Sequence, residues 1–344
     1  MNCCNHKSNL PQVPTVIYCL ITSISFVSSL YIFVPPSVRL LPRDHPLHIK
    51  WRSAATTSVV AVSLTMYPLL FCEYAKDHCA DVSFYVYLGL VRNTSLTESI
   101  TQDVKILCHV FLLYLGSFCC TWMQIYHYAR LIRQEETKSK KTEKLLFRLP
   151  TPRSIHTSFR HTYLQPKLQS FYSFINNQTI RWIQLRNLLI APITEEIMFR
   201  SILLPPLVSS GFSPVKSAWI TPQFFGVAHF HHYFTKRNEC ATKQLFFELL
   251  LQWSYTTLFG AYASHVFIRT GSLLGICMIH SFCNHMGLPN VEFVSRHSIL
   301  FRYRWLIGLL YTIGICLFWR GFDSTLFPNA PVIPTLLAKD RSNR

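Results

Sequence analysis

Two adjacent glutamates and an arginine stand in an otherwise apolar stretch of the chain, at Glu195, Glu196 and Arg200. A charge at the centre of a bilayer costs roughly 2.5–3.5 kcal/mol even on the mildest insertion scales, so ionisable residues in apolar helices point to function. Glu196 and Arg200 are four residues apart and can pair on one helix face. Glu195 is rotated by about 100° from Glu196. We therefore expect Glu196 and Arg200 to be structural and Glu195 to act as a general base.

Two other apolar segments carry polar residues at the same spacing. Phe225 precedes His229 by four residues, and His280 precedes Asn284 by four residues, so each pair shares a helix face. A single histidine in an apolar helix is usually structural. Counting ~1.5 Å per residue from the predicted cytosolic helix ends, however, places Glu195, His229, His280 and Asn284 in one leaflet of the bilayer. We expect these four residues from three helices to form one site.

The residue types fit hydrolysis of a peptide bond. Glu195 with His229 can polarise a water molecule for attack on a carbonyl group. His280 and the amide of Asn284 can donate hydrogen bonds to the oxyanion that forms. A zinc-dependent intramembrane protease is an alternative, because two histidines and a glutamate are a familiar zinc ligand set, although the HExxH spacing is absent. A proton-coupled transporter is another alternative, since intramembrane ionisable residues also mark ion pathways.

The composition favours a membrane protein. Half of the 344 residues are hydrophobic and 14% are charged, well below the quarter that is usual in soluble proteins. The net charge of +17 comes from basic residues that flank apolar segments, which argues against nucleic-acid binding. We predict an all-α polytopic membrane protein with about eight transmembrane helices in one bundle around an intramembrane cavity. The predicted helices cover residues 14–34, 54–72, 106–127, 195–209, 217–233, 246–267, 272–288 and 304–320.

The basic residues also predict a topology. With these helices, 22 of the 33 Lys and Arg residues fall on one side of the membrane, which the positive-inside rule assigns to the cytosol. That side contains a basic loop at 128–170. We expect residues 1–344 to form a single integral membrane domain, with the catalytic core at 180–290 and the active site open to the cytosol.

The three motifs together resemble a known family. EExxxR at Glu195, Glu196 and Arg200, FxxxH at Phe225 and His229, and HxxxN at His280 and Asn284 occur in this order. In these motifs the chain is similar to the CAAX prenyl protease 2 family, the Ras-converting endopeptidases, and in particular to the eukaryotic branch.

This resemblance implies an endopeptidase of the endoplasmic reticulum membrane that removes the last three residues of CAAX proteins. The implied substrates are farnesylated or geranylgeranylated proteins such as Ras-like GTPases, and the protease would use no metal or other cofactor. The resemblance gives Glu195 and His229 the role of activating water, and it gives His280 and Asn284 the oxyanion site. A lipid-anchored substrate also explains why a hydrolase would be embedded in the bilayer.

Overall fold

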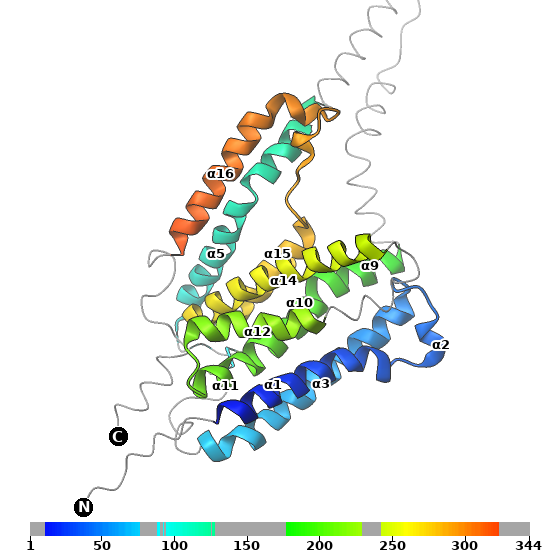
Figure 1. Cartoon of the computed structure of the whole chain (residues 1–344), viewed down its shortest axis with the longest axis vertical. Coiled ribbons are helices and arrows are strands. Elements are labelled where there is room, and N and C mark those ends of the chain that lie inside the picture. The colour runs from blue at the N-terminus through cyan, green and yellow to red at the C-terminus, as the bar shows by residue number, and fades with distance from the viewer. Residues whose placement is uncertain are drawn as a thin grey trace, which may run out of the picture. The chain divides into compact units, whose positions relative to one another are not determined.

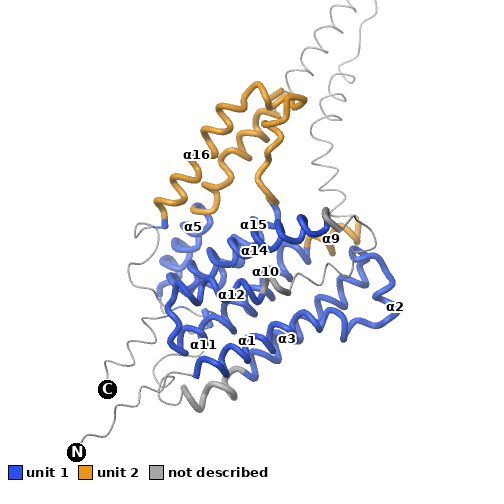
Figure 2. The backbone as a smooth tube through the Cα atoms, in the orientation of Figure 1, with its two compact units in different colours: residues 1–108, 185–285, 322–344 blue, residues 109–184, 286–321 orange. Residues whose placement is uncertain are grey.

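The structure, a computed structural model, describes residues 11–75, 88–89, 92, 94–124, 126–127, 177–228 and 242–322. All regular secondary structure in these ranges is helical, as the sequence predicts (Figure 1). The chain forms two compact units (Figure 2). Unit 1 comprises residues 1–108, 185–285 and 322–344, and unit 2 comprises residues 109–184 and 286–321.

In unit 1, α1 (Gln12–Ile32) and α3 (Pro46–Ala75) lie side by side and are joined by the short helix α2 (Pro36–Arg39) (Figure 1). α1 matches its predicted range closely, whereas α3 begins eight residues before the predicted 54. Prediction from charge-free runs could not find this first part of α3 because it contains Lys50 and Arg52.

The segment with the two glutamates is helical from α9 (Gln178–Leu185) onward. It continues as a π-helical stretch η2 (Arg186–Ile190), α10 (Ala191–Glu196) and a second π-helical stretch η3 (Ile197–Ile202). The short helix α11 (Leu204–Ser209) follows. The prediction that a helix starts near 195 is therefore wrong. Pro192 lies in the first turn of α10, as proline prefers, but the residues before it are already helical.

The part of this helical segment from Met198 to Leu207 packs on α1 and α3. Met198, Phe199, Ile202, Leu203 and Leu207 form a core cluster with Cys19, Phe26 and Val60. The rings of Phe26 and Phe199 meet edge to face with their centroids 5.7 Å apart. Burial of these large side chains fixes the helix that carries the glutamates.

Three more helices of unit 1 follow along the chain. α12 (Pro214–Ala228) packs along α14 (Thr242–Thr270), and a turn at Gly271 leads into α15 (Leu273–Met286). Ser272 in this turn donates to Asp103 of α5 (Leu96–Leu113) at 2.5 Å, and Arg92 bonds to both residues. This polar cluster ties the start of α15 to the part of α5 that belongs to unit 1.

Unit 2 contains the end of α5, the helix 115–124 that follows it, the short helices η4 (Glu292–Val294) and η5 (Ile299–Tyr303), and α16 (Arg304–Gly321). The Tyr311 hydroxyl lies 2.7 Å from Ser117 Oγ and donates to the Asn290 carbonyl at 2.9 Å. A Cβ atom at Gly314 would clash with the Leu112 carbonyl oxygen, so glycine permits the close approach of the two helices.

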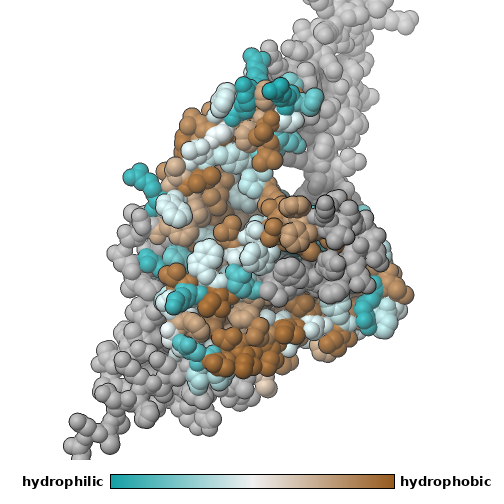
Figure 3. Space-filling view, in the orientation of Figure 1, coloured by the Kyte–Doolittle hydropathy of each residue, from teal (hydrophilic) through white to brown (hydrophobic). Residues whose placement is uncertain are grey.

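The apolar helices show that the protein is embedded in a membrane, but they do not give the number of spans. In the described ranges, Gln12–Ile32 and Ile299–Gly321 are long and apolar enough to cross a bilayer. A third candidate is Leu96–Leu113 together with Leu115–Gln124, a pair bent by 65°. Exposed hydrophobic side chains gather over α1 in Figure 3, including Val13, Ile17, Ile21 and Ile24. The count of eight spans stays a prediction.

Candidate active site

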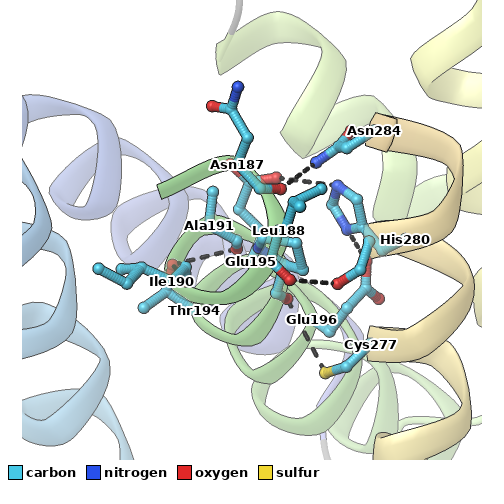
Figure 4. Close-up of polar contacts among 12 residues, drawn as sticks. Asn187, Leu188, Ile190, Ala191, Thr194, Glu195, Glu196, Cys277, His280 and Asn284 are labelled. Carbon is cyan, nitrogen blue, oxygen red and sulfur yellow. Dashed lines mark hydrogen bonds and ion pairs between the residues drawn. The ribbon is translucent and has the colours of Figure 1, made fainter. Parts of the chain in front are cut away.

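The site is centred on His280 of α15, which points at the end of α10 (Figure 4). Its Nδ1 atom lies 2.6 Å from Oε1 of Glu196, and its Nε2 atom lies 3.7 Å from Oε2 of Glu195. One imidazole ring therefore lies between two carboxylates that are adjacent in the sequence. The ring of Phe259 on α14 packs against His280 with the centroids 5.0 Å apart, which restricts the orientation of the imidazole.

Glu196 and Arg200 form the ion pair that their spacing predicts. Arg200 donates from its NH1 group to Glu196 Oε1 at 3.2 Å, and both side chains are completely buried. The same carboxylate oxygen accepts from Arg200 and contacts His280 Nδ1, so the pair also orients the imidazole. In the described part of the chain, Glu196 Oε2 and the Nε and NH2 groups of Arg200 have no hydrogen-bond partner.

The two glutamates differ in their access to solvent. The Glu195 side chain is 22% exposed, whereas Glu196 is 0% exposed. The distance of 3.7 Å from Glu195 Oε2 to His280 Nε2 exceeds that of a hydrogen bond. A single oxygen atom can thus lie within hydrogen-bonding distance of both groups. Of the two carboxylates, Glu195 is the one that a reactant can reach.

Pro192 leaves backbone carbonyls without their helical donor. In an α-helical register the amide of residue 192 would bond to the Leu188 carbonyl, and in a π-helical register to that of Asn187, but proline has no N–H. Ser281 Oγ donates to the Leu188 carbonyl at 2.5 Å. Asn284 Nδ2 donates to the Asn187 carbonyl at 2.9 Å (Figure 4). α15 thus supplies the donors that Pro192 lacks.

These bonds set the register of α15 against the helix that carries the glutamates. Cys277, Ser281 and Asn284 lie on one face of α15, and the Cys277 thiol contacts the Pro192 carbonyl at 3.9 Å. His280 lies between them in the sequence and faces α10. Sequence reasoning missed the contribution of Ser281 and Cys277 because their partners are backbone atoms of another helix, for which residue spacing gives no signal.

The structure brings together four of the seven expected site residues: Glu195, Glu196, Arg200 and His280. Asn284 lies one turn further along α15 and is exposed, with its amide bonded to the Asn187 carbonyl. His229 and the side chain of Phe225 lie outside the described residues, as does the basic loop 128–170. The predicted roles of His229 and Phe225 therefore stay predictions.

Comparison with known proteins shows what the segment that carries this site is similar to. Residues 177–286, which contain all three motifs, match the family model "Type II CAAX prenyl endopeptidase Rce1-like". The chain is 43% identical over 137 residues to CAAX prenyl protease 2 of Homo sapiens, a match that covers 38% of this chain and 40% of that protein. It is 33% identical over 157 residues to the probable CAAX prenyl protease 2 of Schizosaccharomyces pombe, covering 44% of this chain and 55% of that protein.

A longer match extends to most of the chain. The chain is 29% identical over 300 residues to CAAX prenyl protease 2 of Saccharomyces cerevisiae, which covers 83% of this chain and 84% of that protein. The matches to the human and fission yeast relatives span about two-fifths and just over half of those proteins. No solved structure matches the chain significantly. The segment that holds Glu195, Glu196 and His280 thus matches the model of the Rce1-like type II CAAX prenyl endopeptidases, and the chain is similar to CAAX prenyl protease 2 of several eukaryotes, as its motifs predict.

Proposed function

We propose that this protein is an intramembrane endopeptidase that removes the C-terminal tripeptide from prenylated CAAX proteins. The observation that carries the proposal is the contact of His280 with both Glu195 and Glu196, inside the segment that matches the Rce1-like family. An accessible carboxylate beside an oriented imidazole is the arrangement that general acid–base hydrolysis requires.

In the proposed reaction, Glu195 removes a proton from a water molecule while the water oxygen attacks the scissile carbonyl carbon. His229 would help to hold that water. The C–N bond then breaks as the protonated Glu195 returns its proton to the leaving amine, so that no proton is gained or lost by the enzyme. The products are a carboxylate on the prenylated cysteine and a released tripeptide.

His280 and Asn284 would stabilise the oxyanion. Because Glu196 is ion-paired with Arg200, its carboxylate accepts a hydrogen bond from His280 Nδ1–H, which leaves Nε2 on the side of Glu195. Nε2 can donate to an oxyanion only while the ring holds a proton on each nitrogen. Asn284 uses one N–H on the Asn187 carbonyl and has a second N–H for the substrate.

The substrates would be farnesylated or geranylgeranylated CAAX proteins, including Ras-like GTPases, at the endoplasmic reticulum membrane with the site open to the cytosol. A prenyl chain gains about 0.8 kcal/mol for each buried CH₂ group and would hold such substrates at the bilayer. Three features of the sequence support a site that opens to the cytosol. They are the basic flanks of the predicted spans, the basic loop at 128–170 and the position of the motifs near predicted cytosolic helix ends.

The test is cleavage of a farnesylated CAAX peptide by membranes that contain the wild type or the Glu195→Gln variant. Glutamine keeps the size of the side chain but cannot accept the proton, so we expect turnover to fall by at least about 100-fold. The amount and thermal midpoint of the variant should match those of the wild type, because Glu195 is partly exposed and, among the residues that the structure describes, forms no ion pair shorter than its contact with His280. Retained turnover in the folded variant would refute the assignment of Glu195.

A further inference from the structure

Three arginines lie in an electrostatic network that reaches Glu195. Arg43, in the turn before α3, interacts with Arg186 of η2, with Asp44 and with Glu195. Arg52, in the first turns of α3, interacts with both Arg43 and Arg186. All of these residues belong to unit 1. Guanidinium groups from three different elements therefore lie near one another, and that of Arg43 lies near Glu195.

The described acidic groups of this network do not balance its positive charge. Asp44 is the only carboxylate that forms a described ion pair with one of the three arginines, through Arg186 NH1 at 2.9 Å. Glu195, the other carboxylate in the network, is the proposed catalytic base. Tyr31 is the remaining partner and is neutral at physiological pH. Like charges held together in this way favour an additional anion.

The Arg186–Asp44 pair is one that an incoming anion can displace. The Asp44 side chain is 59% exposed and the Arg186 side chain is 21% exposed. Exposed ion pairs contribute only about 0–1 kcal/mol, so exchange of Asp44 for another carboxylate carries little cost. Arg186 is also held by a bond from its Nε to Asn187 Oδ1 at 2.8 Å, which restrains its side chain without neutralising it.

The spacing fits the part of the substrate that is cut off. An extended tripeptide places its terminal carboxylate about 10 Å from the scissile carbonyl. Arg186 and Glu195 are nine positions apart in one helical segment, which corresponds to at most about 13 Å along the axis because part of the segment is π-helical. A substrate whose scissile bond lies at Glu195 can therefore bring its terminal carboxylate to the arginines.

We propose that Arg43, Arg52 and Arg186 bind the free C-terminal carboxylate of the substrate and thereby select which peptide bond is cleaved. This proposal rests on the proposed function and adds a site for the last residue of the CAAX sequence. Arginine suits this task because its planar guanidinium forms two parallel hydrogen bonds with a carboxylate. An enzyme that holds the terminal carboxylate of its substrate at a fixed distance from Glu195 would always release a fragment of the same length.

The experiment compares two farnesylated CAAX peptides that differ only at the C-terminus, one with a free carboxylate and one with a carboxamide. For the wild type we expect kcat/KM to be roughly 10- to 100-fold higher for the carboxylate peptide, the range given by one or two charge-assisted hydrogen bonds. Arg43→Gln and Arg186→Gln should reduce this ratio towards 1, mainly by raising KM for the carboxylate peptide. Arg43 is exposed, so its variant tests the proposal even if Arg186→Gln does not fold.

Asp44→Asn gives a prediction of the opposite sign. Removal of this carboxylate releases Arg186 from its competitor, so KM for the carboxylate peptide should fall a few-fold while that for the amide peptide changes less. Arg39→Gln is the matched control, because Arg39 is an exposed arginine on α2 and is not a partner in the electrostatic network of Glu195. Arg39→Gln should leave the ratio of kcat/KM between the carboxylate and carboxamide peptides at the wild-type value.

The outcomes separate this proposal from the proposed function. If the wild type cleaves both peptides equally, or if the arginine variants slow both equally, the carboxylate site is refuted while the protease function stands. Equal slowing would instead indicate a structural role or contact with anionic lipid. If the wild type cleaves neither peptide, the proposed function itself fails.

Discussion

His280 Nδ1 lies 2.6 Å from Oε1 of Glu196, although the two residues are 84 positions apart in the chain. Both side chains are buried, and Arg200 contacts the same carboxylate oxygen. The second glutamate of the motif thus connects a buried ion pair on one helix to the imidazole of another. The conformation of the site and the stability of the protein therefore depend on the same carboxylate.

Replacement of Glu196 by alanine should destabilise the protein. The change leaves Arg200 as an unpaired buried cation, which typically costs about 3–5 kcal/mol. We expect a marked fall in the thermal midpoint of the purified protein and loss of peptide cleavage. Glu195→Ala should lose cleavage with a much smaller change in the midpoint, so equal destabilisation by the two variants would contradict the division of roles. Because Arg200 and Glu196 are in contact, the Glu196→Ala and Arg200→Ala double variant should lose less than the sum of the two single changes.

Gly260 on α14 is predicted to position Arg200. A Cβ atom at Gly260 would lie 2.9 Å from Arg200 NH2 and 2.7 Å from Pro222 Cβ of α12. Gly260→Ala should therefore push Arg200 and α12 away, cost about 1–3 kcal/mol of stability and lower turnover. Gly308 on α16 is the matched control, because a Cβ atom there meets nothing within 4 Å. Gly308→Ala should leave turnover unchanged and raise helix stability by up to about 1 kcal/mol. Equal behaviour of the two variants in cleavage and thermal unfolding would rule out the packing argument.

Pro192 and Ser281 should be energetically coupled. Ser281→Ala removes the donor of the Leu188 carbonyl, which should cost about 0.5–1.5 kcal/mol and loosen α15. Pro192→Ala restores a backbone N–H that can bond to the same carbonyl. In the Pro192→Ala background, the loss of the Ser281 hydroxyl should therefore cost less, both in the thermal midpoint and in kcat. Additive effects of the two changes would show that the Ser281 hydroxyl and the restored amide of residue 192 do not bond to the same Leu188 carbonyl.

Ser254→Ala is the control for this cycle. The Ser254 hydroxyl donates to the Leu250 carbonyl of its own helix at 2.8 Å. Ser254→Ala therefore removes a similar hydrogen bond, but one that does not connect two helices. We expect no coupling between Ser254→Ala and Pro192→Ala. Ser281→Thr retains the hydroxyl and should keep most of the activity.

Chelation distinguishes the proposed mechanism from a zinc protease. If Glu195 activates water without a metal, cleavage of the farnesylated peptide should be unaffected by phenanthroline. Inhibition by phenanthroline that is reversed by added Zn²⁺ would instead favour the zinc-dependent alternative. A non-chelating phenanthroline isomer at the same concentration controls for disturbance of the membrane.

The sequence predicts some helices closely and others poorly. α1 and α16 match their predicted ranges within two residues at each end. The predicted helix 106–127 is wrong in its start and its continuity, because α5 already begins at Leu96 and the helix 115–124 that follows is bent from it by 65°. α14 extends beyond its predicted range of 246–267 to Thr242 and Thr270, past Lys243 and Arg269. Helices do not end at a charge, so charge-free runs underestimate their length.

The ion pair of Glu196 and Arg200 was predictable, whereas the contact of His280 with Glu196 was not. The first pair lies within one helix, where the spacing of four residues determines proximity. The second pair depends on how α15 packs against α10, and periodicity gives only the face of each helix. The π-helical stretches η2 and η3 were also not predicted, because an apolar residue pattern does not distinguish a π-helical turn from an α-helical one.

The unequal exposure of the two neighbouring acids has a consequence for inhibitor chemistry. An electrophile that esterifies carboxylates would meet Glu195 and could not reach Glu196, so modification should be confined to one of two consecutive residues. A compound that combines such a warhead with an anionic tail would exploit both the accessible acid and the neighbouring guanidinium groups.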